Sequence, residues 1–450
     1  MIENIVDCNK FQEENQVGDL FLYAIPSKYG IHSAINFISI IFIRNLKTGK
    51  SYYFSISHPD SISTISWELF RDKYLKPLKG IKWTIDKKSF KHLTGIDALD
   101  VNLVSYIQFN ELFEESEYET SCHFLIKSRA GNYKEINKSI PLIKHLEFFN
   151  DLADDVSFLL KTFGAEESFL KFNEIIIETL GKLESNGIFV SEDLFNKRFG
   201  KAPDKRGLVY SQYNVYTSTG RPSNRYDGIN YAALNAEDGT RKCFCSRWKE
   251  DGAIVIIDYT AFHPRIVSYL TNYPIDESTD IHTYLSCLYF KKENVDEIDI
   301  KEAKRITFRQ FYGGVEDKYS HIKYLSNLKF YIDEQWKFFN QNGYVLTPLF
   351  KRKITNKHLL DPNPPKVFNY ILQAVEGEIA ISRLKKVMDY LNSKKTLPVL
   401  YTYDAVMYDF HKEDGIDTLK EICKIMGYNG KFPTKIYMGN SYHDVKQILL

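Results

Sequence analysis

Apolar and polar positions follow two different periods along this chain, and the change from one to the other marks its elements. The run Ile254–Ile257 is continuous and β-branched and closes on Asp258, a pattern typical of a buried strand. A helical spacing of apolar residues then continues to about Leu270. The stretch Leu397–Tyr408 predicts a hairpin with Asp404 at its turn.

These two aspartates have two interpretations. A lone aspartate at the end of a strand is more often a helix N-cap than a metal ligand. A second carboxylate in similar surroundings favours a metal site, because two carboxylates brought together can hold the metal pair that drives in-line displacement at phosphorus. Asp258 and Asp404 are therefore the candidate catalytic residues and metal ligands.

Before residue 166, the pattern begins with strands and continues with interleaved helices. Strand-like runs occupy Leu20–Ile25 and Ile35–Arg44, and a turn leads to a return strand at Ser51–Phe54. A long amphipathic helix is predicted from about Leu142 to Phe163, and the acidic segment Glu111–Glu119 is interpreted as a solvated loop. Shorter helical and strand patterns lie between them, at Trp67–Leu75, Lys82–Ile85, Ser89–Leu93 and Val101–Ile107. This order predicts an α/β domain.

The middle of the chain is predicted to hold a helix and a linker. Phe169–Asn186 has strong helical periodicity and ends at Gly187, a residue suited to a helix C-terminus. Lys197–Arg206 is basic and interrupted by glycine and proline, which predicts a linker.

Composition narrows the function only slightly. The 450 residues include 59 Lys and Arg against 58 Asp and Glu, so any nucleic-acid surface must be local. The six cysteines lack C-x-x-C pairs and zinc-site spacing, which predicts reduced thiols in a cytoplasmic protein. There is no apolar run of transmembrane length and no signal peptide, so no contact with a membrane is expected.

The second half carries most of the candidate chemistry. On a helix over Lys301–Gly314, positions 301, 304, 305, 308 and 312 share one broad face, which would offer cations to a triphosphate and aromatic rings to a base and sugar. The alternative is a solvated basic face with two core aromatics. Arg221 lies in a turn-rich segment, and the basic cluster Lys351–Lys357 is more often an exposed loop. Asn369 and Gln373, one helical turn apart, either contact base edges or cap and solvate the helix.

In order and spacing, these segments resemble family A DNA polymerases over about residues 166–450. Asp258-Tyr259-Thr260-Ala261-Phe262-His263-Pro264-Arg265 looks like the first palm motif, Asp-Tyr-Ser-x-x-Glu-x-Arg. Lys304-x-x-x-Phe308-x-x-x-Tyr312-Gly313 matches the spacing of the fingers helix. Tyr403-Asp404-Ala405 stands where the family usually has His-Asp-Glu, and Gly343–Thr347 resembles a segment between the last two motifs.

The resemblance implies a role for each matching residue. Asp258 and Asp404, with Tyr259, would hold two Mg²⁺ ions, or Mn²⁺ in their place. Residues that would bind the incoming dNTP are Lys304, Arg305, Phe308, Tyr312, His263 and His282, although a lone histidine such as His282 is more often structural. Residues that would contact the primer–template DNA are Arg221, Asn369, Gln373 and Tyr403.

Departures from the family pattern are also informative. The glutamate after the last aspartate is Ala405 here, and the arginine one turn before the fingers lysine is Ile300. The asparagine and glycine that flank the fingers phenylalanine are Thr307 and Arg309. Both metal-binding aspartates remain, so the resemblance implies an active enzyme.

His263 replaces a glutamate that, in the family, pairs with the fingers tyrosine and crowds the 2′ position of the sugar. A neutral histidine can still accept a hydrogen bond from Tyr312, but only in one tautomer. One interpretation is that discrimination is preserved. We favour a weakened gate, with easier rNTP incorporation that His263→Glu would suppress.

The first domain resembles, more faintly, the RNase H-like 3′–5′ exonuclease fold that precedes such polymerases. Ala24-Ile25-Pro26 replaces an Asp-x-Glu pair, Ser89 stands at a metal-ligand position, and Phe149-Asn150-Asp151-Leu152-Ala153 replaces Tyr-x-x-x-Asp. Three lost carboxylates cannot hold a metal pair, so the resemblance implies a degenerate domain without proofreading.

The predicted architecture is an α/β (α+β) chain with an exonuclease-like domain at 1–165, a reduced thumb and linker at 166–205, and palm and fingers at 206–450, the fingers at about 280–365. Only about thirty residues separate Gly187 from the arginine-bearing turn, where the family has a much longer thumb. Few phosphate contacts imply weak processivity, with a replisome protein as a partner. The compact chain suggests a phage-type member. A single-subunit RNA polymerase relative and a non-catalytic nucleic-acid-binding protein stay open as alternatives.

Overall fold

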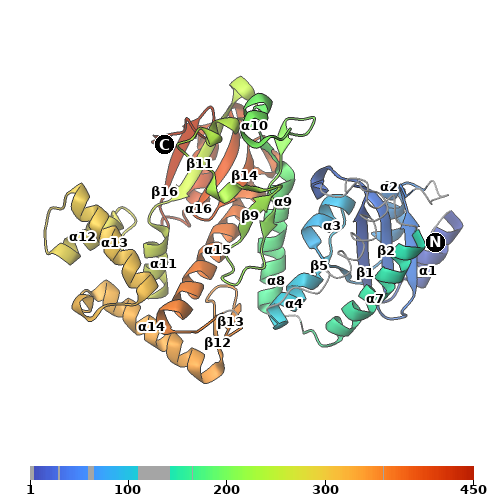
Figure 1. Ribbon diagram of the computed structural model, residues 1–450, viewed down its shortest axis with the longest axis horizontal. Helices are drawn as coiled ribbons and strands as arrows, with labels where there is room; N and C mark the ends of the chain where they lie inside the picture. The colour runs from blue at the N-terminus through green and yellow to red at the C-terminus, as the bar shows by residue number, and fades with distance from the viewer. Residues whose placement is uncertain (1–4, 29–30, 59–64, 110–141, 165, 358) are drawn as a thin grey trace. The chain divides into compact units, whose positions relative to one another are not determined.

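The computed structural model describes residues 5–28, 31–58, 65–109, 142–164, 166–357 and 359–450 (Figure 1). The chain divides into two compact units, Met1–Asn173 and Glu174–Leu450. The acidic segment Glu111–Glu119, predicted as a solvated loop, lies outside the described residues.

The first unit is built on a five-stranded sheet with the order β3-β2-β1-β4-β5. Its antiparallel meander, predicted from the sequence, consists of β1 (Leu20–Pro26), β2 (Ile38–Asn45) and β3 (Ser51–Ser55). The parallel strands β4 (Lys82–Thr84) and β5 (Leu99–Asp100) extend the sheet from β1. A meander extended by parallel strands is the topology of the RNase H-like fold.

Helices cover both faces of this sheet, because alternate residues of β1 and β2 are apolar on both sides. One core joins the sheet to α1 (Ile5–Glu14), to α2 (Trp67–Leu69) with the helical turn Phe70–Leu75, and to α3 (Lys87–Thr94). On the other face, the ring of Phe149 from α7 (Leu142–Lys161) lies 4.9 Å from that of Tyr23 and 5.8 Å from that of Phe42. After β5 comes α4 (Val101–Phe109).

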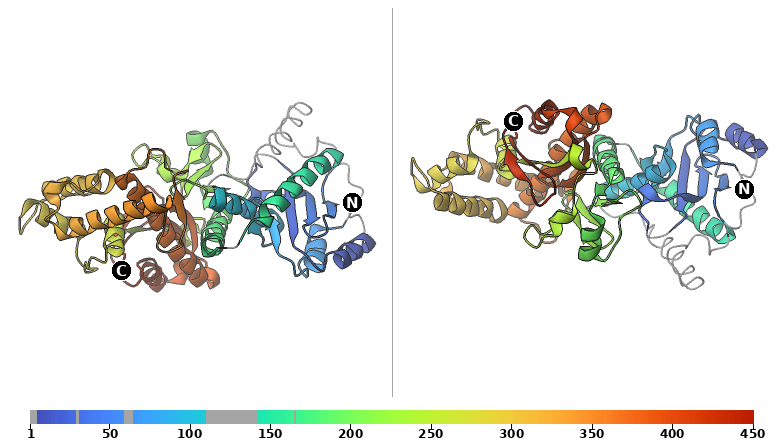
Figure 2. Two further views of the ribbon diagram at one scale, coloured as in Figure 1. Left: turned by 90° about the horizontal axis from the view of Figure 1, so that it is seen from below. Right: turned by 90° about the horizontal axis from the view of Figure 1, so that it is seen from above.

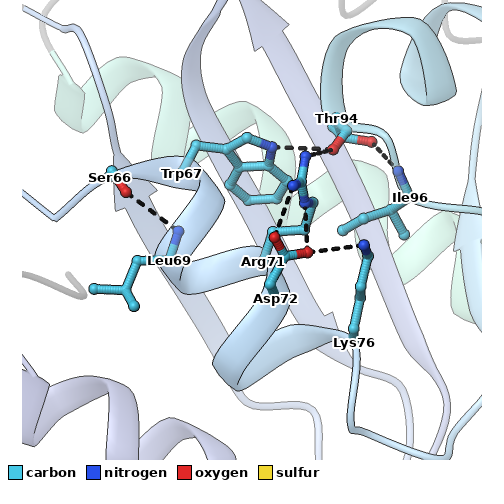
Figure 3. A network of polar contacts seen from close by, with 8 residues as sticks. All are labelled: Ser66, Trp67, Leu69, Arg71, Asp72, Lys76, Thr94 and Ile96. Atoms are coloured by element: carbon cyan, nitrogen blue, oxygen red, sulfur yellow. Dashed lines mark hydrogen bonds and ion pairs between the residues drawn. The ribbon is translucent and has the colours of Figure 1, made fainter.

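A polar network ties the helical segment after residue 66 to the end of α3 (Figure 3). Trp67 donates from Nε1 to the carbonyl oxygen of Thr94 (3.0 Å), and the guanidinium of Arg71 lies against the same carbonyl. Arg71 also pairs with Asp72, which pairs in turn with Lys76 (2.8 Å). Hydrogen bonds from Arg71 and Lys76 hold the pKa of the Asp72 carboxyl well below its usual range. The network therefore fixes two helices against each other at one edge of the first core.

The second unit contains an antiparallel sheet with the order β14-β15-β11-β16-β17. Its central strand, β11 (Gly252–Tyr259), confirms the strand predicted before Asp258. The predicted hairpin is also confirmed, as β14 (Leu397–Thr402) and β15 (Ala405–His411). The far edge is formed by β16 (Thr434–Gly439) and β17 (Lys446–Ile448).

Four helices support this sheet. They are α9 (Glu178–Asn186), α11 (Phe262–Leu270), α15 (Pro364–Tyr390) and α16 (Ile416–Met426). Gly187 ends α9 with a φ of 61°, as the sequence predicted. The helical run before it is continued by α8 (Glu167–Lys171) and the turn Phe172–Ile177. Asn363 caps α15, and Pro364 opens it at a position where its missing N–H costs nothing.

A helical subdomain stands beside the second sheet, in yellow and orange in Figures 1 and 2. It consists of α12 (Ile281–Phe290), α13 (Glu297–Gly313) and α14 (Lys323–Asn342), followed by the hairpin of β12 (Tyr344–Leu346) and β13 (Lys353–Thr355). Asp280 caps α12 and Asp296 begins a capping box on α13, so the sequence sets where both helices start.

Short strands and turns connect α9 to the central strand. They are β6 (Ile188–Phe189), α10 (Glu192–Phe199), β7 (Leu208–Val209), β8 (Tyr213–Asn214), β9 (Ser223–Tyr226) and β10 (Ile229–Asn230). The segment Lys197–Arg206, predicted as a linker, lies within the second unit instead. Lys197 and Arg198 form the last turn of α10, where cations favour a helix C-terminus, and Gly200 closes it. In the part of the chain that the structure describes, no helix has the length and apolarity to cross a membrane.

Candidate active site

The register of the second sheet brings the two predicted aspartates together. Asp258 of β11 lies directly opposite Ala405 of β15, the residue after Asp404. The hairpin turn consists of Tyr403 and Asp404, and Tyr403 has a φ of 66°, a conformation that costs a non-glycine residue energy. Both carboxylates thus lie at the same end of two adjacent core strands.

The electrostatics of this pair suit a cation. Burial and then the charge of Asp404 raise the pKa of Asp258 to about 7, while Lys435, its partner on β16, opposes the rise. Burial also raises the pKa of Asp404. A divalent cation between the two carboxylates would stabilise their ionised forms. Oxygen donors are the ligands that Mg²⁺ prefers. The donor set therefore fits Mg²⁺, although the described residues include no group of three or more acidic, His or Cys side chains that could hold a metal.

Tyr259, predicted to belong to the metal site, turns its side chain into the core. Its hydroxyl donates to the carbonyl oxygen of Met426 (3.1 Å), and its ring stacks on Phe262 at 4.0 Å. Only its backbone carbonyl is left as a donor for a metal.

A buried carboxylate, Glu376 of α15, holds Arg221 beside the aspartates. Arg221 approaches the two oxygens of Glu376 at 2.9 and 3.0 Å, and its guanidinium lies 3.8 Å from the ring centre of Tyr403. The Glu376 charge contributes to the raised pKa of Asp404, whereas Arg221 opposes it. The predicted DNA-contacting residues Arg221 and Tyr403 are thus brought together next to Asp404.

Arg352 fixes the loop that carries Arg221. Arg352 is buried and donates to the carbonyl oxygens of Thr217 (3.3 Å) and Ser218 (2.9 Å), so it is not part of an exposed basic loop as its sequence suggested. Gly220 has a φ of 73°, and Arg352 fills the place where a Cβ would stand. At Gly377, the missing side chain lets the Gly220 carbonyl oxygen come within 3.2 Å of the ideal Cβ position.

His263 of α11 connects the sheet to the helical subdomain. Its Nδ1 lies 3.0 Å from the hydroxyl of Tyr312 on α13, and its Nε2 lies 3.2 Å from Glu376. Tyr312 stacks nearly parallel to Phe308, at an interplanar angle of 10°. Asn369, on α15, donates to the backbone carbonyl of Tyr312 (3.4 Å). These predicted site residues therefore form one connected surface.

The cations of α13 differ in availability. Lys304 is exposed, and among the described residues it has no hydrogen-bond or ion-pair partner. Arg305 instead pairs with Glu302 through two contacts of 2.8 and 2.6 Å. The structure thus leaves Lys304 free for an anion and engages Arg305 elsewhere.

His282, in the first turn of α12, belongs to the same electropositive region. Burial lowers its pKa to about 4, helped by the charges of Lys304 and Lys435. Its Nδ1 is buried without a hydrogen-bond partner among the described residues. A neutral imidazole with an unsatisfied nitrogen next to a free lysine could bind a phosphate oxygen.

Arg265 fixes the segment before α12. Its buried guanidinium donates to the carbonyl oxygens of Asp276 (2.9 Å), Glu277 (3.3 Å) and Thr279 (2.6 Å). This clamp sets where α12 begins, and with it the position of His282.

Sequence reasoning missed three residues of this site, which are Arg352, Glu376 and Lys435. A signal for Glu376 existed, because a carboxylate three residues after Gln373 falls on the face of α15 that also carries Asn369. Lys435 could not be found without the register that sets it opposite Asp258.

The two units together define a class of fold. An RNase H-like domain precedes a unit in which an antiparallel sheet stands beside the helical subdomain α12–α14. The POL domain of Pol1 from M. smegmatis, solved in complex with a DNA primer–template and dNTP, has this fold. It matches with a TM-score of 0.71 over 96% of this chain and 97% of its own, at 13% sequence identity. No protein-family model and no curated protein matches the sequence.

Proposed function

We propose that this chain is a template-directed DNA polymerase that adds dNTPs to a primer 3′ end. One observation carries the proposal: the palm register places Asp258 and Asp404 at adjacent strand ends, on a fold shared with a polymerase domain solved with primer–template and dNTP. In-line nucleotidyl transfer needs two carboxylates in this relation, because charge develops at both the attacking and the leaving oxygen.

Asp258, Asp404 and the carbonyl of Tyr259 would hold two Mg²⁺ ions, which supply activation of the primer 3′-hydroxyl and neutralisation of the triphosphate. Lys304 binds the triphosphate through its free ammonium, and neutral His282 donates a hydrogen bond to it. Phe308 and Tyr312 form an aromatic platform for the base and sugar.

Three residues beside the aspartates and the aromatic platform would bind the primer–template: Arg221, Asn369 and Gln373. Asn369 and Gln373 lie one turn apart on α15, and Gln373 makes no side-chain hydrogen bond among the described residues. Glu376 holds Arg221 over the ring of Tyr403. The remaining donors of Arg221 can therefore bind a phosphate at a low cost in side-chain conformational entropy.

For the first unit, we propose a scaffold without proofreading activity. Ala24 and Pro26 lie on β1 and Ser89 lies on α3, at positions where the exonuclease pattern requires carboxylates. Incubating the protein with 3′-labelled single-stranded DNA and Mg²⁺ or Mn²⁺ tests this. Release of the terminal nucleotide that survives Asp258→Asn would contradict it.

Primer extension on a defined template, with dNTPs or rNTPs and Mg²⁺, tests the main proposal. Templated extension with dNTPs supports it. A preference for rNTPs would favour the single-subunit RNA polymerase alternative, and DNA binding without extension would favour an accessory protein.

A further inference from the structure

Glu376 is the most deeply buried carboxylate of the site, with 1% of its side chain exposed. Its Oε2 lies 2.9 Å from Nε of Arg221 and 3.2 Å from Nε2 of His263, and its Oε1 accepts from Nη2 of Arg221 (3.0 Å). An uncompensated carboxylate is costly to bury, and these contacts offset that cost for Glu376. Neither contact to Oε2 is aligned as a hydrogen bond, so the positive charge of the Arg221 guanidinium attracts this oxygen without a directed bond.

This carboxylate decides which nitrogen of His263 carries hydrogen. A lone pair on Nε2 facing a carboxylate oxygen at 3.2 Å would be repelled, so Nε2 carries the hydrogen. In the neutral imidazole, Nδ1 is then the acceptor, and it receives the Tyr312 hydroxyl at 3.0 Å. Burial and the Glu376 charge raise the pKa of Tyr312, so the phenol keeps the proton that it donates.

Of the three residues joined by these contacts, Glu376, His263 and Tyr312, it is Tyr312 that a nucleotide can contact. Tyr312 is 43% exposed, and it lies eight residues after the free Lys304 on the same face of α13. Eight residues of helix span about 12 Å, which is enough for a triphosphate chain to reach from Lys304 and leave the sugar beside Tyr312. The hydroxyl of Tyr312 is held through His263 and its backbone through Asn369, so the ring has little freedom.

We infer that Glu376 is a positioning residue for sugar discrimination: through the tautomer of His263 it fixes Tyr312 against the 2′ position of the incoming nucleotide. The inference rests on the proposed polymerase function. In this chain the carboxylate that supports sugar discrimination is therefore Glu376 on α15, whereas the position on α11 is occupied by His263.

The inference reverses the expectation for His263→Glu. A glutamate at 263 would face Glu376, and two carboxylates in contact cannot both ionise. The single substitution should therefore loosen Tyr312 and raise rNTP incorporation. The double variant His263→Glu with Glu376→Gln leaves one carboxylate and should return discrimination toward the wild-type value.

The test is single-nucleotide incorporation on one primer–template, with kcat/KM measured separately for a dNTP and the matching rNTP. Glu376→Gln keeps the shape of the side chain and removes its charge, and should lower the dNTP-to-rNTP ratio about tenfold, as expected when the hydrogen bond from Tyr312 to Nδ1 of His263 loses the tautomer that accepts it. In a Tyr312→Phe background the same substitution should change the ratio less than twofold, because the hydroxyl that it positions is gone. Glu378→Gln is the matched control. Glu378 is also a buried carboxylate of α15, but it accepts from the Phe350 backbone (3.2 Å), so its loss should not move the ratio.

Thermal melting of each variant separates misfolding from the effect on discrimination. If Glu376→Gln does not fold, Glu376→Asp retains the charge at a longer distance from His263 and should give an intermediate ratio. A ratio that stays at the wild-type value in folded Glu376→Gln or Glu376→Asp overturns the inference while the polymerase proposal stands. A wild-type protein that incorporates no dNTP overturns both.

Discussion

The backbone N–H of Tyr259 donates a hydrogen bond to the carbonyl oxygen of Asp404 (2.9 Å). This bond closes the end of the β11–β15 ladder just where both strands present a carboxylate. The distance between Asp258 and Asp404 is therefore set by sheet geometry, and the repulsion between the two carboxylates lowers the stability of the second unit.

Asp258→Asn should stabilise the metal-free protein at pH 8. The pKa of Asp258 is raised from 3.8 to about 7, so the folded state binds its proton more tightly than the unfolded state. Its contribution is therefore fully present below pH 3.8 and lost as the pH rises through 7. We expect a gain of about 1–2 kcal/mol at pH 8 after allowing for partial exposure, measured by denaturant unfolding with a chelator. The gain should vanish near pH 4, and the exposed Asp333→Asn should show no such pH dependence. Equal stability of Asp258→Asn and wild type at pH 8 would argue against a strained carboxylate pair.

Lys304→Ala should raise the KM for dNTPs about tenfold or more, because a charge-assisted hydrogen bond to the triphosphate is lost. Arg305→Ala removes a neighbouring cation that is already paired with Glu302 and should change the KM less than twofold. Steady-state kinetics of single-nucleotide incorporation compares the two. A larger effect of Arg305→Ala would show that α13 presents a different face to the nucleotide.

Lys435→Met should shift the acid limb of Mg²⁺ binding to higher pH. Lys435 opposes the rise in the pKa of Asp258, so its removal raises that pKa further, and the carboxylate stays protonated to a higher pH. Calorimetric titration of the protein with Mg²⁺ between pH 6 and 8.5 measures the shift. The exposed Lys431→Met, with its ammonium near the Tyr428 ring instead, is the control. Identical profiles for Lys435→Met and wild type would remove Lys435 from the site.

Primer extension in the presence of trap DNA should give short products. Only short elements lie between Gly187 and the Arg221 loop, so few side chains there can contact duplex phosphates. Product length per encounter should also fall steeply with added salt. Long products at moderate salt would contradict the expectation and remove the need for a partner protein.

The sequence predicts those elements whose period is unambiguous. The β-branched run before Asp258 and the hairpin around Asp404 are confirmed because buried strands need continuous apolar residues. α15 has apolar residues on nearly every face, so its apolar periodicity did not reveal Glu376, and only the spacing of Glu376 from Asn369 and Gln373 marked it. Arg352 was misjudged for the same kind of reason, since a basic cluster normally indicates solvent, and only the packing of the Gly220 loop shows it buried. Contacts that depend on strand register or on loop packing cannot be predicted from the local pattern of apolar and polar residues.

The most direct test of the account is primer extension by the wild type, Asp258→Asn and Asp404→Asn on one labelled primer–template with dNTPs and Mg²⁺. The wild type should produce a ladder whose sequence follows the template. Both variants should lose extension by at least about a thousandfold while melting at or above the wild-type temperature, because each removes a ligand of the metal pair and relieves the carboxylate repulsion. Templated extension that persists in either variant, or a folded wild type that extends no primer with Mg²⁺ or Mn²⁺, would contradict the assignment of this site.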